Sequence, residues 1–241
     1  MTPPIEYVCE TGSTNADLLS RLRAGEALDE GHWLVADRQT AGRGRQGRAW
    51  LDGPGNFMGS TVVRLSDRDP PASSLSFVAA LAVYETVLPG LADPFALMLK
   101  WPNDVLLEGA KFCGLLLEAE RGHVVIGIGV NLAAAPQVTD RAVRALSQSG
   151  PAPSRDAFAQ ALARQFATEL QRWRDYGSET ILRRWKAAAH PPGTRLRVHD
   201  ADGQPVQGTY DGLGDDGALR LRLADGTTHI MHAGDVMLED K

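Results

Sequence analysis

Three apolar segments in the middle of the chain follow one another so closely that no helix fits between them. The first spans 95–107 and is interrupted by a proline, and the others span 112–119 and 123–130. Turn-forming residues separate them at 108–111 (EGAK) and at 121–122 (RG). Neighbouring parallel strands need a crossover of a dozen or more residues, which these turns cannot supply. The spacing therefore predicts an antiparallel meander within an α+β fold and argues against a doubly wound parallel sheet.

Apolar patterning elsewhere predicts the remaining elements of the first 190 residues. Strands are expected at 5–9, 33–36 and 57–65, and helices at 16–22, 73–88, 155–175 and 178–189. Ser13-Thr14-Asn15 offers an N-cap for the first of these helices. The expected architecture is a mixed, largely antiparallel sheet with helices.

The last 49 residues differ in character from the rest. They contain eight glycines and three Asp-Gly turns, at 202–203, 216–217 and 225–226. Short alternating segments such as 219–223 (LRLRL) lie between the turns, as is typical of a small β-barrel. We therefore expect two domains, 1–190 and 191–241.

Charge is distributed unevenly along the 241 residues, whose formal net charge is −5. Residues 37–50 carry four Arg and one Asp, a local charge of +3, so the other 227 residues carry −8. A long polyanion would need a broad basic face, so the pattern favours a local anion site over nucleic-acid binding.

The cysteines and the apolar runs bear on cellular location. Cys9 and Cys113 lie in apolar segments at no metal-binding spacing, and we expect both to be reduced and buried. No secretory signal is apparent, and no apolar run is expected to reach the ~18 residues of a membrane helix. These features predict a cytoplasmic protein with no membrane partner.

The positive segment contains a loop, Gly42-Arg43-Gly44-Arg45-Gln46-Gly47-Arg48, which lies between two predicted strands. Glycine lets the backbone approach a ligand, and arginine forks suit carboxylate or phosphate. The segment lacks the Gly-Lys-Ser/Thr of a Walker loop and the spacing of a Rossmann loop. The alternative is an RNA-binding arginine tract, although such tracts usually lie in disordered tails.

Three other segments are individually weak indications of a site. Lys100-Trp101-Pro102-Asn103-Asp104 ends a strand with polar groups that could hold Mg²⁺ or an amine, although Pro-Asn-Asp is also a common turn. Lys111 could be an ordinary surface lysine. Glycines alternate in 127–131 (GIGVN), which often marks close approach by a ligand or another chain segment.

Taken together and in order, these segments resemble the biotin–protein ligases over about residues 5–240. The matching segments are 13–15 (STN), 39–50 (QTAGRGRQGRAW), 100–104 (KWPND), 111–114 (KFCG) and 127–131 (GIGVN). The resemblance implies a catalytic domain related to class II aminoacyl-tRNA synthetases and lipoate ligases, followed by an SH3-like barrel. It also implies ATP-dependent formation of biotinyl-5′-AMP, with Mg²⁺ as cofactor, and transfer of biotin to a lysine of a carrier protein.

The resemblance assigns roles to individual residues. Those implied to bind biotin are Ser13, Thr14, Asn15, Gln39, Gly42, Arg43, Gly44, Arg45, Lys111 and Gly114. Those implied to bind ATP or the adenylate are Arg45, Arg48, Trp50, Asn103, Lys111 and Asn131. The catalytic set is Lys111, Arg45 and Asp104, where Asp104 is a metal ligand, a base or a group that orients the incoming lysine.

Partners follow from the same resemblance. The expected acceptor is the biotin carboxyl carrier protein of acetyl-CoA carboxylase or a related carboxylase. Nothing in the sequence precedes the expected catalytic domain, so a DNA-binding repressor role is not expected. Pairing of two copies through a free sheet edge is possible in such a fold. The alternatives left open are a ligase for lipoate or another acid, an RNA-binding module and a noncatalytic biotin sensor.

Overall fold

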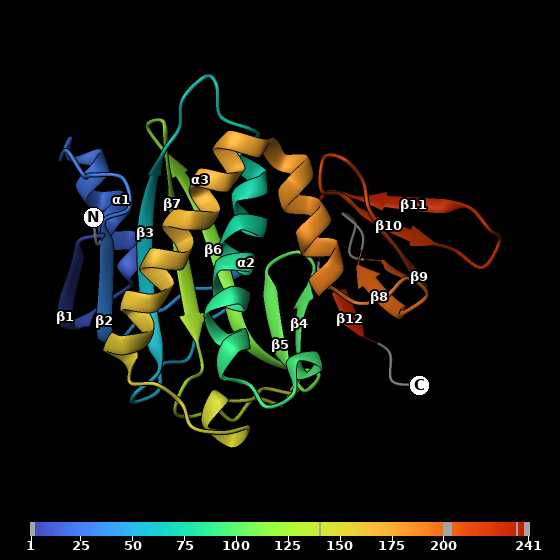
Figure 1. Ribbon diagram of the computed structural model, residues 1–241, viewed down its shortest axis with the longest axis horizontal. Helices are drawn as coiled ribbons and strands as arrows, with labels where there is room; N and C mark the ends of the chain where they lie inside the picture. The colour runs from blue at the N-terminus through green and yellow to red at the C-terminus, as the bar shows by residue number, and fades with distance from the viewer. Residues whose placement is uncertain (1–2, 140, 200–203, 235, 239–241) are drawn as a thin grey trace.

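The computed structural model describes residues 3–139, 141–199, 204–234 and 236–238. Seven strands form one mixed sheet in the order β1-β2-β3-β7-β6-β5-β4 (Figure 1). They are β1 Ile5–Thr11, β2 Trp33–Gln39, β3 Phe57–Arg64, β4 Leu97–Lys100, β5 Asp104–Leu107, β6 Ala110–Glu120 and β7 His123–Val130. Only β1 and β2 pair in parallel among these described strands. The predicted meander and the mixed, largely antiparallel sheet are confirmed.

The helix α1, Thr14–Arg23, connects the two parallel strands and covers one face of the sheet. Successive strand residues point to opposite faces, and the buried apolar residues follow this rule. Leu34, Val62 and Val125 pack with the leucines of α1. Their neighbours Val35, Val63 and Ile126 belong to the core on the other face. The strands β2, β3 and β7 therefore each contribute to two separate apolar layers.

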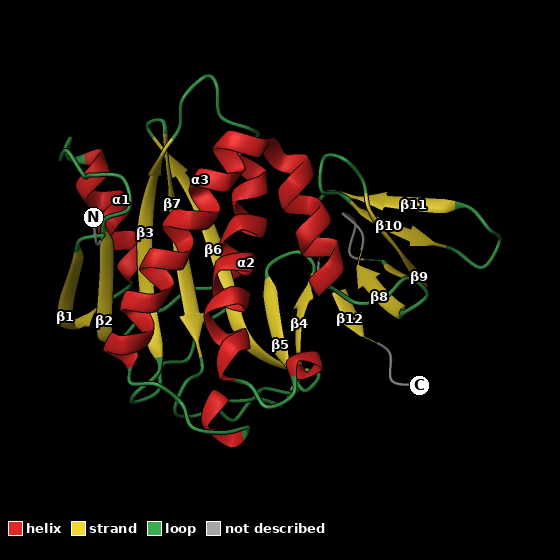
Figure 2. Ribbon diagram, viewed as in Figure 1, coloured by secondary structure: helices red, strands yellow, loops and turns green. Residues whose placement is uncertain are grey.

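Two longer helices cover that second face, α2 (Leu75–Val87) and α3 (Arg155–Ala188) (Figure 2). Phe158 and Phe166 of α3 pack edge-on against sheet aromatics. The two helices predicted at 155–175 and 178–189 are both present in α3, where they meet at a break at Gly177, whose φ of 75° lies outside the helical region.

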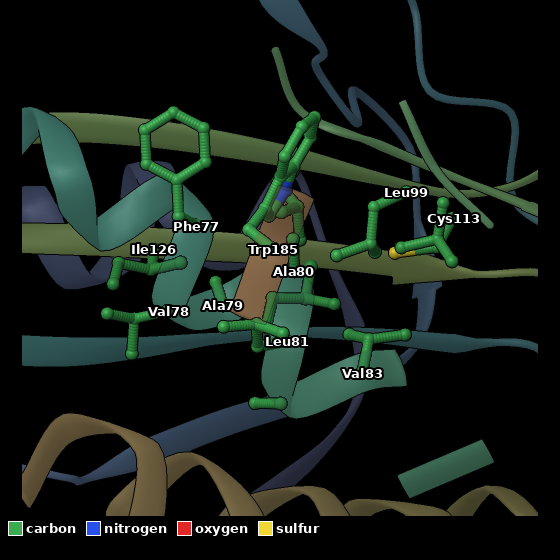
Figure 3. Close-up of a cluster of buried hydrophobic side chains, with 14 of the residues drawn as sticks. Phe77, Val78, Ala79, Ala80, Leu81, Val83, Leu99, Cys113, Ile126 and Trp185 are labelled. Carbon is green, nitrogen blue, oxygen red and sulfur yellow. The ribbon is translucent and has the colours of Figure 1, made fainter. Parts of the chain in front are cut away.

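The helix α2 lies in the core, which explains why its segment is more apolar than we expected of any run in this sequence. The stretch Ala72–Gly90 is long and apolar enough to span a membrane by length and composition, so the expectation that no run reaches this length was wrong. Residues 78–83 are each at most 1% exposed, and Figure 3 shows several of them packed against Ile126 and Trp185. Helix turns that are buried on all sides are apolar all round, as residues 77–83 of α2 are.

A second sheet of five strands, in the order β11-β10-β9-β8-β12, follows α3. Its strands are β8 Arg195–His199, β9 Pro205–Leu213, β10 Leu219–Arg222, β11 Thr228–Met231 and β12 Val236–Leu238. All of their pairings are antiparallel. The described strands form an open sheet, so the SH3-like barrel stays a prediction, as does the domain boundary near 190. The Asp202-Gly203 turn lies outside the described residues.

The two cysteines differ in environment. Cys113 on β6 is fully buried, and burial raises the pKa of its thiol above the usual value. Cys9 is exposed, contrary to expectation. It lies on β1, which forms the outer edge of the sheet, so its apolar neighbours in sequence do not bury it.

Candidate active site

A cavity of about 820 Å³ lies on the face of the sheet that α1 covers only in part. Fourteen of the fifteen predicted site residues line it, although they come from segments far apart in the sequence. They are Ser13, Thr14, Asn15, Gln39, Arg43, Gly44, Arg45, Arg48, Trp50, Asn103, Asp104, Lys111, Gly114 and Asn131. The structure therefore brings the predicted residues together, with Gly42 just outside the lining.

Glycines keep the floor of this cavity open. Asp104, Gly114 and Gly129 lie opposite one another on neighbouring strands, so they share one face of the sheet. A Cβ on Gly129 would lie 2.3 Å from Trp50 Cε2, and one on Gly127 would lie 2.5 Å from Asn15 Oδ1. The alternating glycines predicted to permit close approach thus make room for two predicted site residues.

Neutral polar groups gather at the α1 end of the cavity. Ser13 is the N-cap of α1, and its hydroxyl accepts the backbone N–H of Ala16. The neighbouring Thr14 donates its backbone N–H to Gln39 Oε1 at 2.8 Å. A cap fixes the start of a helix, so this local signal also fixes where Thr14 and Asn15 lie.

Sequence reasoning missed one residue at this end of the cavity. Ser60 on β3 lines the cavity, and its hydroxyl lies 2.7 Å from the Thr14 hydroxyl. It is fully buried within the apolar strand Phe57–Arg64. A buried serine among apolar residues is the signal that could have identified it, because buried polar groups need partners.

The arginine loop is a short hairpin that extends over the cavity. Gly44 N–H donates to Arg48 O at 2.7 Å, and Trp50 N–H donates to Gly42 O at 2.9 Å. Gly42 is required at the base of this hairpin, since a Cβ there would lie 2.8 Å from Trp50 O. At the tip, Gln46 has a φ of 55°. The hairpin places its arginine side chains along the cavity wall.

Arg45 joins the hairpin to two distant parts of the chain. Its Nη1 donates to Asn103 Oδ1 at 3.2 Å and to the backbone oxygen of Gly234 at 3.4 Å. Residues 236–238 of the second sheet also line the cavity. Which residues of the second sheet reach the cavity depends on how the two sheets pack.

A buried ion cluster lies beside the hairpin. Asp104 Oδ1 forms an ion pair with Lys111 Nζ at 2.6 Å, and Oδ2 accepts a hydrogen bond from Lys100 Nζ at 3.3 Å. The Asp104 side chain is 12% exposed. Burial raises the pKa of the Asp104 carboxyl, but the two ammonium groups more than offset this effect and hold that pKa below its usual value. Lys100 lines the cavity but was not among the predicted site residues.

The donor set does not fit a Mg²⁺ ion held by the protein. Both carboxylate oxygens of Asp104 face lysine ammonium groups, so a cation there would meet two positive charges. In the part of the chain that the structure describes, no three His, Cys, Asp or Glu side chains are grouped as metal ligands. The geometry favours Asp104 as the counter-charge of the lysines.

Asn131 follows β7 at the far side of the cavity. It is 1% exposed, and its Oδ1 lies 3.5 Å from Asn56 Nδ2. Among the described residues its Nδ2 has no hydrogen-bond partner. A buried donor without a partner is costly, so this amide is suited to a ligand acceptor.

Comparison with protein families gives matches over both sheets. The profile described as the Biotin/lipoate A/B protein ligase family matches residues 7–131. The profile of the biotin protein ligase C terminal domain matches residues 193–238.

Two curated relatives cover nearly the whole chain. The chain is 39% identical over 237 residues to the biotin–[acetyl-CoA-carboxylase] ligase of Mycobacterium tuberculosis, covering 97% of this chain and 88% of that protein. It is 36% identical over 226 residues to the ligase of the same name from Paracoccus denitrificans, covering 89% and 92%.

Among solved structures, the biotin protein ligase of Aquifex aeolicus in complex with biotin and ATP superposes with a TM-score of 0.84. It is 23% identical and covers 99% of both chains, so it shows a shared fold. The family profile spans more than half of this chain, and the relatives exceed 30% identity over most of their own length. The chain therefore belongs to the biotin/lipoate A/B protein ligase family.

Proposed function

We propose that this protein is an ATP-dependent biotin–protein ligase. The observation that carries the proposal is the layout of the single cavity described above. Neutral polar groups lie at one end, around Thr14 and Gln39, and a cluster of cations lies over the adjoining sheet, around Arg45 and Lys111. A neutral ring system with an anionic tail matches this layout, because each part meets groups of suitable polarity.

The first step joins two anions. The biotin carboxylate attacks the α-phosphorus of ATP, an O–P bond forms, and pyrophosphate leaves to give biotinyl-5′-AMP. Two unit charges ~4 Å apart repel by about 4 kcal/mol at an effective dielectric constant of about 20. Arg43, Arg45, Arg48 and Lys111 supply fixed positive charge along one cavity wall, which offsets that repulsion and stabilises the charge that develops.

The second step transfers biotin from the adenylate. A neutral amine of the carrier lysine attacks the anhydride carbonyl, the C–N amide bond forms as the C–O bond to the phosphate breaks, AMP leaves, and the proton lost by the amine passes to the AMP phosphate or to water. Lys111 is placed to polarise the reacting carbonyl oxygen, while Asp104, the counter-charge of the two lysines, orients the incoming neutral amine by accepting one of its N–H hydrogens. Because the two lysines hold the pKa of the Asp104 carboxyl below its usual value, this group is a weak base, and orientation is the role that we favour.

The adenosine part of the ligand is assigned to Trp50 and Asn131. One side of the Trp50 indole lies against the glycines of the sheet, so the ring is held as a rigid wall of the cavity. Such a wall suits stacking with a purine. The unpartnered Nδ2 of Asn131 suits an acceptor on the purine edge.

Several wider features belong to the same proposal. The acceptor would be the carrier of acetyl-CoA carboxylase, as the names of both curated relatives suggest. Mg²⁺ would arrive on the phosphates of ATP, which is its common mode of binding. We also propose the domains 1–190 and 191–241, a cytoplasmic location, and pairing of two copies at the β1 edge. A DNA-binding role is not proposed.

The test is incubation with ATP, Mg²⁺, biotin and a purified carrier domain, followed by intact-mass measurement of the carrier. We expect one biotin per carrier and pyrophosphate exchange that depends on biotin. Calorimetry with biotin and with lipoate tests the related ligase. Exchange that depends on lipoate but not on biotin would overturn the proposal, and biotin binding without exchange would indicate a noncatalytic sensor.

A further inference from the structure

A chain of hydrogen bonds runs behind the neutral end of the cavity to a carboxylate that does not line it. Glu118 Oε2 accepts Asn15 Nδ2 at 2.8 Å, and Asn15 Oδ1 accepts the Ser60 hydroxyl at 2.7 Å. The Ser60 oxygen lies 2.7 Å from the Thr14 hydroxyl, which in turn lies 3.1 Å from Gln39 Oε1. These contacts bring together five residues from four elements.

The carboxylate fixes the direction of the whole chain. A carboxylate can only accept, so the amide nitrogen of Asn15 must face Glu118. The backbone oxygen of Leu116, 3.4 Å from the same nitrogen, is a second acceptor that supports this orientation. The amide oxygen of Asn15 therefore faces Ser60 and takes its one hydroxyl hydrogen.

The remaining hydrogens follow by counting. The hydroxyl hydrogen of Thr14 has two acceptors within reach, Ser60 at 2.7 Å and Gln39 Oε1 at 3.1 Å. Because Ser60 has given its own hydrogen to Asn15, the shorter contact needs the hydrogen of Thr14, whereas Gln39 Oε1 already accepts the Thr14 backbone N–H. In this direction the Thr14 oxygen accepts no hydrogen from Ser60, so both of its lone pairs remain unused by the hydrogen-bond chain. In the reverse direction it would accept the Ser60 hydrogen and lose one of them.

The cavity then has a defined polarity at this end. Thr14 offers acceptor lone pairs, and Gln39, whose Oε1 accepts the Thr14 backbone N–H, offers the two hydrogens of Nε2. A cyclic urea carries two N–H donors and one carbonyl acceptor, so it meets complementary groups. A ring without N–H donors would leave buried acceptors unpaired, which costs affinity.

We propose that Glu118 is a positioning residue that acts through Asn15 and Ser60 to orient the hydroxyl hydrogens of the cavity, and so makes it selective for the N–H groups of a urea ring. The inference rests on the proposed function, because it concerns how the same site selects biotin. Glu118 itself touches no substrate.

The test compares three variants by calorimetry with biotin and by steady-state kinetics. Glu118→Ala should weaken biotin binding by about ten- to a hundredfold, the range for one hydrogen bond to a charged group. Glu118→Gln keeps an acceptor oxygen and should stay within about threefold of the wild type. The matched control is Glu120→Ala, because Glu120 lies on the same strand and face as Glu118. Its partner Arg23 belongs to α1, as Asn15 does, but takes no part in the chain of hydrogen bonds described above.

Two further readouts separate positioning from a general loss of structure. The KM for ATP and the rate of transfer from preformed biotinyl-5′-AMP should be unchanged in Glu118→Ala. In a Ser60→Ala background, Glu118→Ala should add less than a twofold effect, because the path through Ser60 is already broken. The Ser60→Ala variant alone should weaken biotin binding about tenfold, and this test remains if Glu118→Ala does not fold.

The outcomes distinguish this inference from the function on which it rests. If wild-type protein shows biotin-dependent pyrophosphate exchange but Glu118→Ala binds biotin normally, only the inference is overturned. Equal losses in Glu118→Ala and Glu120→Ala, or independent effects of Glu118→Ala and Ser60→Ala, would overturn it too. If wild-type protein neither binds biotin nor supports the exchange, both proposals fall.

Discussion

The indole of Trp50 occupies the place that a side chain on Gly129 would need. A Cβ built on Gly129 would lie 2.3 Å from Trp50 Cε2, a distance that cannot be relieved without moving the ring. The neighbouring Gly114 faces the same indole, with a Cβ contact of 3.0 Å to Cζ3. The two glycines therefore define where the tryptophan wall of the cavity lies.

We expect Gly129→Ala to displace this wall and to raise the KM for ATP at least about tenfold, since one lost aromatic stacking contact contributes roughly 1–3 kcal/mol. Biotin affinity measured by calorimetry should change much less. Gly90→Ala is the control, because a Cβ there meets nothing within 4 Å. An unchanged KM for ATP would contradict the assignment of Trp50.

Gly127→Ala provides the opposite pattern. Its Cβ would lie 2.5 Å from Asn15 Oδ1, at the neutral end of the cavity. We expect weaker biotin binding, by about tenfold or more, with less effect on the KM for ATP. Comparing the two alanine variants in one assay checks whether the neutral end and the tryptophan wall serve different parts of the ligand.

Local signals predicted most of the fold because they act over short distances. The turns at 108–111 and 121–122 indicated antiparallel strands, and the cap at Ser13 set the start of α1. The single segment predicted over 95–107 is two antiparallel strands, β4 and β5, which the break at Pro102 separates. Cys9 shows where such signals fail. Its burial depends on whether β1 has a neighbour on its outer side, and strand order is a property of the whole sheet.

The site was predictable to a similar degree and for a similar reason. Residues in distinctive segments, such as Arg45 and Lys111, could be found from sequence. Ser60 and Lys100 could not be assigned, because their importance depends on partners that only the folded chain brings near. The contact of Arg45 with Gly234 likewise depends on packing between two sheets.

Arg45→Gly should release biotinyl-5′-AMP into solution. The substitution removes the contacts to Asn103 and Gly234, which hold the hairpin over the cavity, and adds a flexible residue to it. Water and stray amines should then reach the anhydride. We expect increased labelling of a lysine-rich bystander protein, measured by streptavidin blot.

Arg68→Gly, at an exposed loop position, is the control for lost charge. Bystander labelling by Arg45→Gly at the wild-type level would count against the lid role of the hairpin. Weaker adenylate formation alone would show only that the guanidinium binds anions.

Asp104→Asn should slow transfer more than adenylate formation. The variant keeps the size of the side chain but removes the charge that Lys100 and Lys111 share. We expect transfer from preformed biotinyl-5′-AMP to fall by at least about tenfold, measured by rapid quench. Because the pKa of the Asp104 carboxyl lies below its usual value, the wild-type rate near neutral pH should follow ionisation of the acceptor amine.

The Asp104→Asn variant also needs a check of stability. Removing one partner of a buried ion pair costs about 3–5 kcal/mol, so its Tm should fall. Assays below that temperature separate the two effects. Normal transfer by folded Asp104→Asn would rule out both the orienting role and the base role.

His190 should make the folded protein sensitive to mild acid. It is 6% exposed, and its Nε2 has no hydrogen-bond partner among the described residues. A parallel bridge between Leu99 and Ala189 places it next to the position of Lys100. Burial, and then the charge of Lys100, lower the pKa of His190 from 6.5 to about 4. The folded protein therefore keeps this ring neutral where the unfolded chain would bind a proton.

The sign of the effect follows from this difference in proton binding. The unfolded chain gains a proton at His190 as the pH falls through 6.5, whereas the folded protein gains it only near pH 4. The free energy of unfolding should therefore decrease as the pH is lowered from 6.5 to about 4, by about 3 kcal/mol in total from this one group. Asp104 does not share the window, because the pKa of its carboxyl is lowered below 3.8.

Urea denaturation between pH 7.5 and pH 4.5, with His190→Gln as the comparison, isolates this group. Glutamine has no proton to gain, so the variant should lose less stability than the wild type as the pH falls, while every other titrating group stays the same. The gap between the two curves should change mainly between pH 6.5 and pH 4.5. Parallel curves would mean that the ring is not held neutral, and hence that Lys100 and the surrounding core do not exclude a second positive charge at this junction.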